Sequence, residues 1–282
     1  MLDVITSRDN KWLKQFRAAL RGTGPRNGQP IGVEGPKLIE EALRSGLQAE
    51  AFLVSEGGER EAARILRAAS TSDAGIPRSR VFRTTDKLFE GVAGTETPQG
   101  VAALFRQREW GFDDALRGAG ELRVSSPLVI VLAAVQDPGN VGTIVRSAEA
   151  FGATGVIAAR GTADPWSPKA LRASTGSALR LPVLRGLAIP VVLAQLKIAG
   201  LRVYAASSAH AERTGEADFS EPAAIFVGNE SSGVPAEVER AADAIVTIPI
   251  AASVESLNAG VAASLVLYEA ARQRDAAARG AA

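Results

Sequence analysis

Three short apolar runs in the second half of this 282-residue chain each end in a group of polar residues. The runs are Leu128–Val135, Ala223–Val227 and Ala244–Ile250, and their length and composition are typical of buried strands. In an open α/β sheet, ligands bind in the crevice beyond the carboxyl ends of the strands, where chain reversals leave backbone groups unpaired. The second half is therefore predicted to be an α/β domain with a ligand site at these strand ends.

The polar segment after the first run predicts a strand end followed by a helix. Pro138 and Gly139 interrupt the strand, and Asn140 is a favourable N-cap residue. Apolar residues then recur at helical spacing; they are Val141, Ile144, Val145, Ala148 and Phe151. This stripe lies opposite Arg146, which is therefore expected to point away from the buried face. Taken alone, the segment favours the simpler interpretation of a helix cap followed by a solvated arginine.

The second and third polar segments add a carboxylate and an irregular stretch. Glu230 directly follows an apolar strand, where a buried carboxylate needs a partner, and Arg146 is a candidate. Pro249 lies inside the third run, which predicts an edge or irregular stretch whose backbone groups are free to meet a ligand. The following segment, Ala259–Leu267, is predicted to be a buried helix with small residues that allow close packing.

Together these segments resemble the SpoU (TrmH) branch of the SPOUT superfamily of RNA ribose methyltransferases. The resemblance runs from about Leu128 to Arg274, and three motifs in this order are far more specific than any one of them. The motifs are Asn140 with Arg146, Gly228-Asn229-Glu230, and Ile248-Pro249-Ile250 with Ser256-Leu257-Asn258. The chain departs from the family at Ala133-Ala134, where many relatives carry an acidic residue and glycine, and at Val234, where leucine is usual.

The resemblance implies a fold, a cofactor and a reaction. The fold is a parallel sheet whose carboxyl-terminal segments form a trefoil knot, and the cofactor is S-adenosylmethionine, bound in a bent form within the knot. The reaction is transfer of its methyl group to a ribose 2′-hydroxyl of structured RNA, expected to be ribosomal rather than transfer RNA. The family's cofactor-binding backbone positions match Gly228, Ile248 and Leu257, and its catalytic positions match Asn140, Arg146, Glu230, Ser256 and Asn258.

Two roles are open for Arg146, which by resemblance lies at the hydroxyl. It is either the base or a group that positions the ribose and its phosphate. A guanidinium is protonated far above neutral pH, which favours positioning and stabilisation of the forming alkoxide. Family members are dimers in which a neighbour can contribute to the site, so a homodimer is expected, with the small-residue helix after Asn258 as a candidate surface.

Composition restricts the chemistry further. The chain has no cysteine and one histidine, His210, which excludes disulfides, thiolate nucleophiles and cysteine-based zinc sites, and no metal is expected. No segment reaches about 18 continuous apolar residues, and the amino terminus lacks a signal-peptide core. A cytoplasmic location without membrane association is therefore expected.

The first half is predicted to be a smaller α/β domain that binds RNA. Residues 1–108 are assigned to it, 109–126 to a polar linker, and 127–282 to the SPOUT domain. The sequences Glu34-Gly35 and Thr97-Pro98-Gln99-Gly100 resemble the family's substrate-binding domain, whose fold is shared with RNA-binding ribosomal proteins. Basic residues predicted to contact RNA are Lys11, Lys14, Arg17 and Arg21 on one helix face, and Arg272 and Arg274 near the carboxyl terminus. Without RNA, the first four residues are explained by a solvent-exposed basic helix face. The two arginines are explained by the favourable interaction of cations with the carboxyl end of a helix.

Two alternative functions explain the sequence less well. A noncatalytic RNA-binding or ribosome-assembly protein would keep the basic helix and the ribosomal-protein-like domain, but has no need of Asn140, Arg146, Glu230 and Asn258. A Rossmann-type methyltransferase would need a Gly-rich turn after an early strand, with an acidic residue beyond it, and the sequence contains no such turn.

Overall fold

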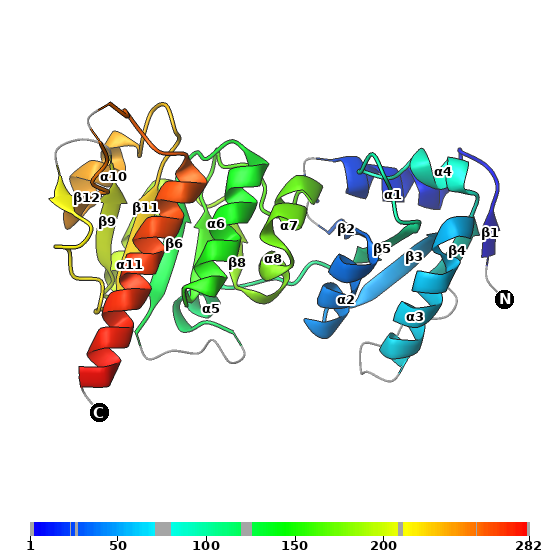
Figure 1. Ribbon diagram of the computed structural model, residues 1–282, viewed down its shortest axis with the longest axis horizontal. Coiled ribbons are helices and arrows are strands. Elements are labelled where there is room, and N and C mark those ends of the chain that lie inside the picture. The colour runs from blue at the N-terminus through cyan, green and yellow to red at the C-terminus, as the bar shows by residue number, and fades with distance from the viewer. Residues whose placement is uncertain are drawn as a thin grey trace. The chain divides into compact units, whose positions relative to one another are not determined.

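The computed structural model describes residues 3–22, 24–25, 28–70, 80–119, 126–207, 211–251 and 253–280. His210 lies outside this range. The chain divides into two compact units, each with its own sheet and helices (Figure 1). The first comprises Met1–Glu109 and Trp166–Leu179, and the second comprises Trp110–Pro165 and Arg180–Ala282. This division differs from the predicted boundaries in segment 166–179 and in grouping 110–126 with the second unit.

The first unit contains a five-stranded mixed sheet in the order β1-β4-β3-β5-β2. β4 is parallel to β1 and β3, whereas β5 is antiparallel to both β3 and β2. Buried residues of α1 and α4 pack together on one face of the sheet, as the predicted small α/β domain requires. The elements are β1 (Asp3–Ile5), α1 (Lys11–Arg21), β2 (Ile31–Glu34), α2 (Pro36–Arg44), β3 (Ala49–Ser55), α3 (Glu59–Ser70), β4 (Val81–Thr84), α4 (Asp86–Glu90) and β5 (Val101–Phe105).

The helix predicted to carry Lys11, Lys14, Arg17 and Arg21 on one face is α1. The Asn10 side chain caps it by accepting a hydrogen bond from the backbone N–H of Trp12 at 2.8 Å. Leu13, Phe16 and Leu20 lie one or two turns apart and are all buried against the sheet. α1 therefore has one buried apolar face.

The second unit contains a seven-stranded sheet in the order β10-β12-β9-β11-β6-β7-β8, and every described pairing in it is parallel. The carboxyl ends of its strands therefore lie at one edge of the sheet, as predicted. Its elements are α5 (Phe112–Arg117), β6 (Leu128–Leu132), α6 (Pro138–Ala150), β7 (Gly155–Ala158), β8 (Val183–Arg185), α9 (Ile189–Ile198), β9 (Arg202–Ala206), β10 (Glu212–Arg213), β11 (Ala223–Val227), α10 (Ala236–Ala241), β12 (Ala244–Thr247) and α11 (Ala259–Gly280). Between β7 and β8 the chain forms α7 (Pro168–Ser174), which belongs to the first unit, and α8 (Ser177–Arg180), which belongs to it up to Leu179.

The three predicted strands are present, but two are shorter than expected. β11 has the predicted bounds, whereas β6 ends at Leu132 and β12 ends at Thr247. Pro249 therefore lies beyond the sheet, because its missing N–H and fixed φ do not suit a strand flanked on both sides.

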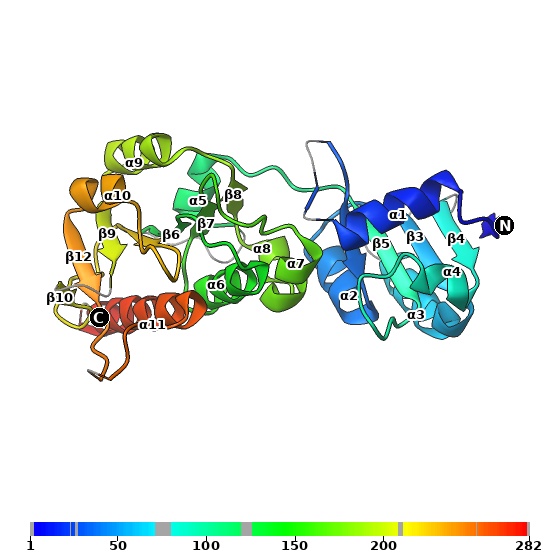
Figure 2. The same ribbon diagram turned by 90° about the horizontal axis from the view of Figure 1, so that it is seen from above.

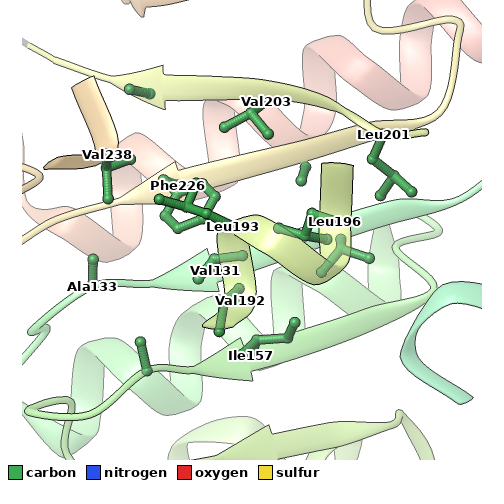
Figure 3. Packing of buried hydrophobic residues seen from close by; sticks show 14 of the residues in the cluster. Val131, Ala133, Ile157, Val192, Leu193, Leu196, Leu201, Val203, Phe226 and Val238 are labelled. Carbon is green, nitrogen blue, oxygen red and sulfur yellow. The ribbon is translucent and has the colours of Figure 1, made fainter. Parts of the chain in front are cut away.

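Helices cover both faces of this second sheet (Figure 2). α6 and α11 lie on one face, and α5, α9 and α10 lie on the other. On the face covered by α5, α9 and α10, alternate strand residues such as Val131 and Phe226 pack with Val192 and Leu196 of α9 (Figure 3). Because both faces are covered, every residue of β6 and β11 is buried, which explains their uninterrupted apolar sequences.

The start of α6 corrects one prediction. Its N-cap is Asp137, whose carboxylate accepts from the backbone N–H of Asn140 at 3.2 Å, so Asn140 is not the N-cap. Pro138 occupies the first helical turn, where the missing N–H costs nothing. Four residues of the predicted stripe are buried, whereas Phe151 is half-buried at the C-cap, and Arg146 lies on the exposed side of α6.

α11 packs along α6 through small side chains. A Cβ on Gly260 would lie 3.2 Å from the Thr143 methyl, so a larger residue would fit only if Thr143 moved by a few tenths of an ångström. One turn further on, the hydroxyls of Ser147 and Ser264 are hydrogen-bonded at 2.7 Å. The small residues on this face of α11 thus contact α6 within the chain, and a dimer surface on α11 stays a prediction.

The predicted linker contains a helix. α5 lies within segment 109–126, and its Ala115 is fully buried against β7. Gly155 permits this packing, since a Cβ there would overlap the backbone of Ala115. A six-residue helix leaves too short a periodic pattern to be recognised in a polar sequence.

None of the helices in the described part of the chain is both long and apolar enough to cross a lipid bilayer.

Ala134 holds a left-handed backbone conformation just after β6, with φ of 63°. Its N–H donates to the Thr162 hydroxyl at 3.1 Å, and its carbonyl accepts from the Asn229 amide at 3.3 Å. This is one of the positions where many family members carry glycine, which adopts positive φ without steric conflict.

We expect Ala134→Gly to raise the free energy of unfolding by about 0.5–1 kcal/mol, because relief of the left-handed strain outweighs the added entropy of the unfolded chain. Urea denaturation would measure it. As a control, Ala271→Gly in the middle of α11 should lower stability by about 0.5–1 kcal/mol. Equal losses in both variants would show that Ala134 is unstrained.

Candidate functional site

A chain of side-chain hydrogen bonds joins the three polar segments. The Asn258 amide donates to the carbonyl oxygen of Asn140 at 3.0 Å, and the Asn140 amide nitrogen donates to the Glu230 carboxylate. These residues are 118 and 90 positions apart in sequence. The segments predicted to converge at the strand ends therefore do so, and Asn140 is the residue common to both bonds.

Asn258 is oriented by the helix that it caps. Its side-chain oxygen accepts from the backbone N–H groups of Gly260 at 3.0 Å and Val261 at 3.3 Å, at the start of α11. With the oxygen occupied, the amide nitrogen faces Asn140. Asn140 must then present its own oxygen to Asn258 and its nitrogen to Glu230, so one cap fixes the direction of the whole chain of bonds.

A tight bend follows β11 and holds Glu230 at its start. The backbones of Asn229 and Gly233 pair in both directions, at 3.1 and 2.8 Å. The Asn229 side chain accepts from the N–H of Ser231 at 2.9 Å and donates to Ala134. Gly228 is required here, because a Cβ would overlap the backbone of Gly233.

This bend forms one wall of a cavity of about 310 Å³ within the second unit. The predicted cofactor residues Gly228, Ile248 and Leu257 all line it, as do Glu230 and Ser256. The remaining wall comes from the ends of β9 and β12, from α10 and from the first turns of α11. Within the described residues, no group of three or more histidines and carboxylates is arranged to hold a metal ion.

Glu230 and Arg146 differ from their expected arrangement. Glu230 is exposed rather than buried, and its described partner is Asn140 rather than Arg146. Arg146 does not line the cavity, and no hydrogen bond or ion pair of its guanidinium is found within the described residues. Its catalytic role therefore stays a prediction.

The basic face of α1 is partly used inside the first unit. Arg17 donates to the Gly91 carbonyl at 3.1 Å, and Arg21 donates to the carbonyls of Ala93 and Glu90 at 2.7 and 2.9 Å. Both arginines thus fasten α1 to the loop after α4. Lys11 and Lys14 are exposed, with Lys14 in a surface ion pair to Asp9 at 3.3 Å. RNA contact by these four residues stays a prediction.

Arg274 is engaged by backbone carbonyls. Its guanidinium donates to four of them at 2.6–2.9 Å, on Phe219, Ser126, Pro127 and Glu221. Burial lowers the pKa of this guanidinium. These bonds tie α11 to the segments preceding β6 and β11, which favours a structural role over RNA contact. Arg272 is more exposed and pairs with Glu269, so it stays a candidate.

Several cavity residues were missed by the sequence analysis. Ser207 directly follows β9, so its position at a strand end is a sequence signal of the same kind as in the three polar segments. Thr247 ends β12 one residue before the recognised motif. Glu239 lies on α10, and no motif or strand end marks its position.

Comparison with known proteins identifies similar chains for both units. Residues 127–268 match the SpoU rRNA Methylase family, and residues 26–103 match the MRM3-like substrate binding domain. The 23S rRNA (guanosine(2553)-2′-O)-methyltransferase RlmP of Bacillus subtilis is 34% identical over 84% of this chain and 86% of its own length.

Solved structures agree with these matches. The SpoU methyltransferase AviRb from Streptomyces viridochromogenes, in complex with the cofactor AdoMet, has a TM-score of 0.79 at 29% identity, covering 94% of this chain and 98% of its own. The AdoMet-bound rRNA methyltransferase from Sinorhizobium meliloti has a TM-score of 0.78 at 29% identity, covering 96% and 98%. The predicted α/β fold class is confirmed, while the knot itself stays a prediction of the resemblance.

We expect Gly228→Ala to disrupt the bend, because the added methyl group would overlap backbone that cannot move aside cheaply. The variant should lose about 1–3 kcal/mol of stability and bind S-adenosylmethionine, the ligand predicted from the resemblance, at least about tenfold more weakly. Thermal unfolding and calorimetry would measure the two effects. Gly215→Ala is the control, since its Cβ would meet open space. Equal behaviour of the two variants would contradict the crowding argument.

Proposed function

Because this chain belongs to the SpoU rRNA methylase family, we infer that it transfers a methyl group from S-adenosylmethionine to a ribose 2′-hydroxyl of RNA. The observation that carries this inference is the chain of bonds from Asn258 through Asn140 to Glu230, beside a cavity lined by the predicted cofactor residues. A noncatalytic RNA-binding protein would need neither the bonds nor the cavity, so the catalytic alternative is favoured.

The cavity suits S-adenosylmethionine in its chemistry. Its wall combines apolar side chains such as Ile248 and Leu257 with backbone groups of the bend after Gly228, which can hydrogen-bond to an adenosine group. Gly228, Ile248 and Leu257 would hold the cofactor, which supplies an electrophilic methyl group on a sulfonium. The protein then has to align the ribose hydroxyl with that methyl group.

We propose that Asn140, Glu230, Ser256 and Asn258 hold the acceptor side of the site. Asn140 is fixed at both ends of its amide, and Asn258 is fixed by the helix that it caps. Asn140 and Asn258 therefore lose little further conformational entropy when RNA binds. Arg146 is proposed to position the ribose and its phosphate and to stabilise the forming alkoxide, since a protonated guanidinium is a poor base.

The proposed substrate is ribosomal RNA, acted on in the cytoplasm. Support comes from the B. subtilis relative, whose name assigns it a 23S rRNA guanosine, and from the match of residues 26–103 to a substrate-binding domain. Comparing alkali-resistant linkages in RNA from cells with and without the gene tests this, because a 2′-methoxy group cannot attack the neighbouring phosphate. A resistant linkage lost from transfer RNA instead would overturn the ribosomal assignment.

We further propose a homodimer. α11 exposes Val261, Leu265 and Tyr268 at helical spacing, next to the small residues that contact α6. The Tyr268 ring also meets Phe151 at the end of α6 edge-on, with ring centroids 5.7 Å apart. Exposed apolar residues gathered on one helix face are typical of an interface. Arg146, which does not line the cavity of its own chain, could then act at the site of a neighbour.

Replacing Arg146 should separate turnover from cofactor binding. We expect Arg146→Ala to lower the single-turnover rate by about 10²-fold or more, while the Kd for S-adenosylmethionine changes by less than about twofold. Calorimetry measures the second quantity. Near-normal turnover would remove Arg146 from the mechanism.

A charge on the exposed face of α11 should dissociate the dimer. We expect Leu265→Lys to sediment as a monomer at micromolar concentration, because an interface cannot bury an unpaired ammonium. Ile198→Lys is the matched control, since Ile198 is 87% exposed at the end of α9, on the other face of the sheet. A monomeric unsubstituted protein, or an unchanged dimer in Leu265→Lys, would contradict the proposal.

A further inference from the structure

The charged side chains that line the cavity are all acidic among the described residues. They are Glu230 and Glu239, and neither lysine nor arginine contributes to the described wall. A partly enclosed space with one sign of charge attracts ligands of the opposite sign. The cavity is therefore suited to a cationic ligand.

The two carboxylates differ in their surroundings. Glu230 accepts a hydrogen bond from Asn140 and belongs to the proposed acceptor site. Glu239 lies on α10 and is half-buried, and no ion pair of its carboxylate occurs among the described residues. Glu239 is thus a negative charge at the cavity wall that the bonds between the three motifs do not use.

The proposed donor and its product differ in charge rather than shape. Each carries one ammonium and one carboxylate, and the donor also carries a sulfonium. When the methyl group bonds to the ribose oxygen, the carbon–sulfur electron pair stays on sulfur and the hydroxyl loses its proton. The donor has a net charge of about +1 and the product, S-adenosylhomocysteine, a net charge of about 0 near neutral pH.

We propose that Glu239 is a specificity-determining residue that makes the cavity bind the cationic donor in preference to the neutral product. This proposal rests on the proposed function. The Glu239 carboxylate attracts the sulfonium of the donor, and this attraction is lost when the methyl group leaves. Transfer of the methyl group thereby weakens binding at the moment when the spent cofactor has to dissociate.

The magnitude is set by distance and screening. One unit charge acting on another across about 8–10 Å, at an effective dielectric of about 20–40, corresponds to about a 3- to 30-fold change in Kd. An interaction of this range is weakened by salt, since the Debye length falls from about 30 Å at 0.01 M to about 3 Å at 1 M. A hydrogen bond to a shared part of the two ligands would instead change both affinities together.

The test is calorimetry of the full chain with S-adenosylmethionine and S-adenosylhomocysteine, in the unsubstituted protein, Glu239→Gln and Glu237→Gln. Glu237 is the matched control, because it is exposed on the same helix and does not line the cavity. We expect Glu239→Gln to weaken donor binding by about 3- to 30-fold while product binding stays within about twofold. The loss of preference for the donor over the product in Glu239→Gln should be largest at low ionic strength. Glu237→Gln should keep the preference of the unsubstituted protein.

The outcomes separate this proposal from the one that it rests on. Equal weakening of donor and product in Glu239→Gln, or no change in either, would overturn the charge-based preference while methyl transfer by the unsubstituted protein still stood. Failure of the unsubstituted protein to bind either ligand would overturn the proposed function and this inference with it. Unfolding midpoints of the three proteins show whether a weakened variant is still folded.

Discussion

The Asn140 side chain is bonded at both ends of its amide, and the geometry of the site depends on this. Asn258 and Glu230 reach it from elements that are distant in sequence, and the cap of α11 decides which way each amide points. A buried or half-buried amide with mismatched neighbours loses a hydrogen bond at once, so few alternative arrangements have the same energy. The polar groups are consequently positioned before any ligand arrives.

The sequence predicted those parts of the structure in which local pattern and packing agree. The apolar stripe of α6, the bounds of β11 and the convergence of the three motifs were confirmed, since each follows from burial on a regular element. The parts that it missed depend on competition between neighbours. Asp137 and Asn140 are both good caps, and only Pro138 in the first turn decides between them. α5 is only six residues long, so it leaves no periodic signal in the sequence. The position of Glu239 at the cavity is likewise not marked by any periodic pattern.

The arginines show why charge alone does not locate an RNA surface. Arg17, Arg21 and Arg274 look like solvated cations in the sequence, yet all three donate to backbone carbonyls. A guanidinium has five donors in a fixed plane, so it can join several chain segments at one point. Arg274 does this for the segments before β6 and β11, and these bonds become visible only once the fold is known.

The long sequence separations in the site also govern how it forms. Contacts across 90 and 118 residues cannot exist until the intervening strands and helices have closed large loops, which is slow compared with local structure. Intermediates of the second unit are thus expected to lack a usable pocket even when most of their helices are present. A molecule that binds there selects the fully assembled chain and stabilises it against unfolding by mass action.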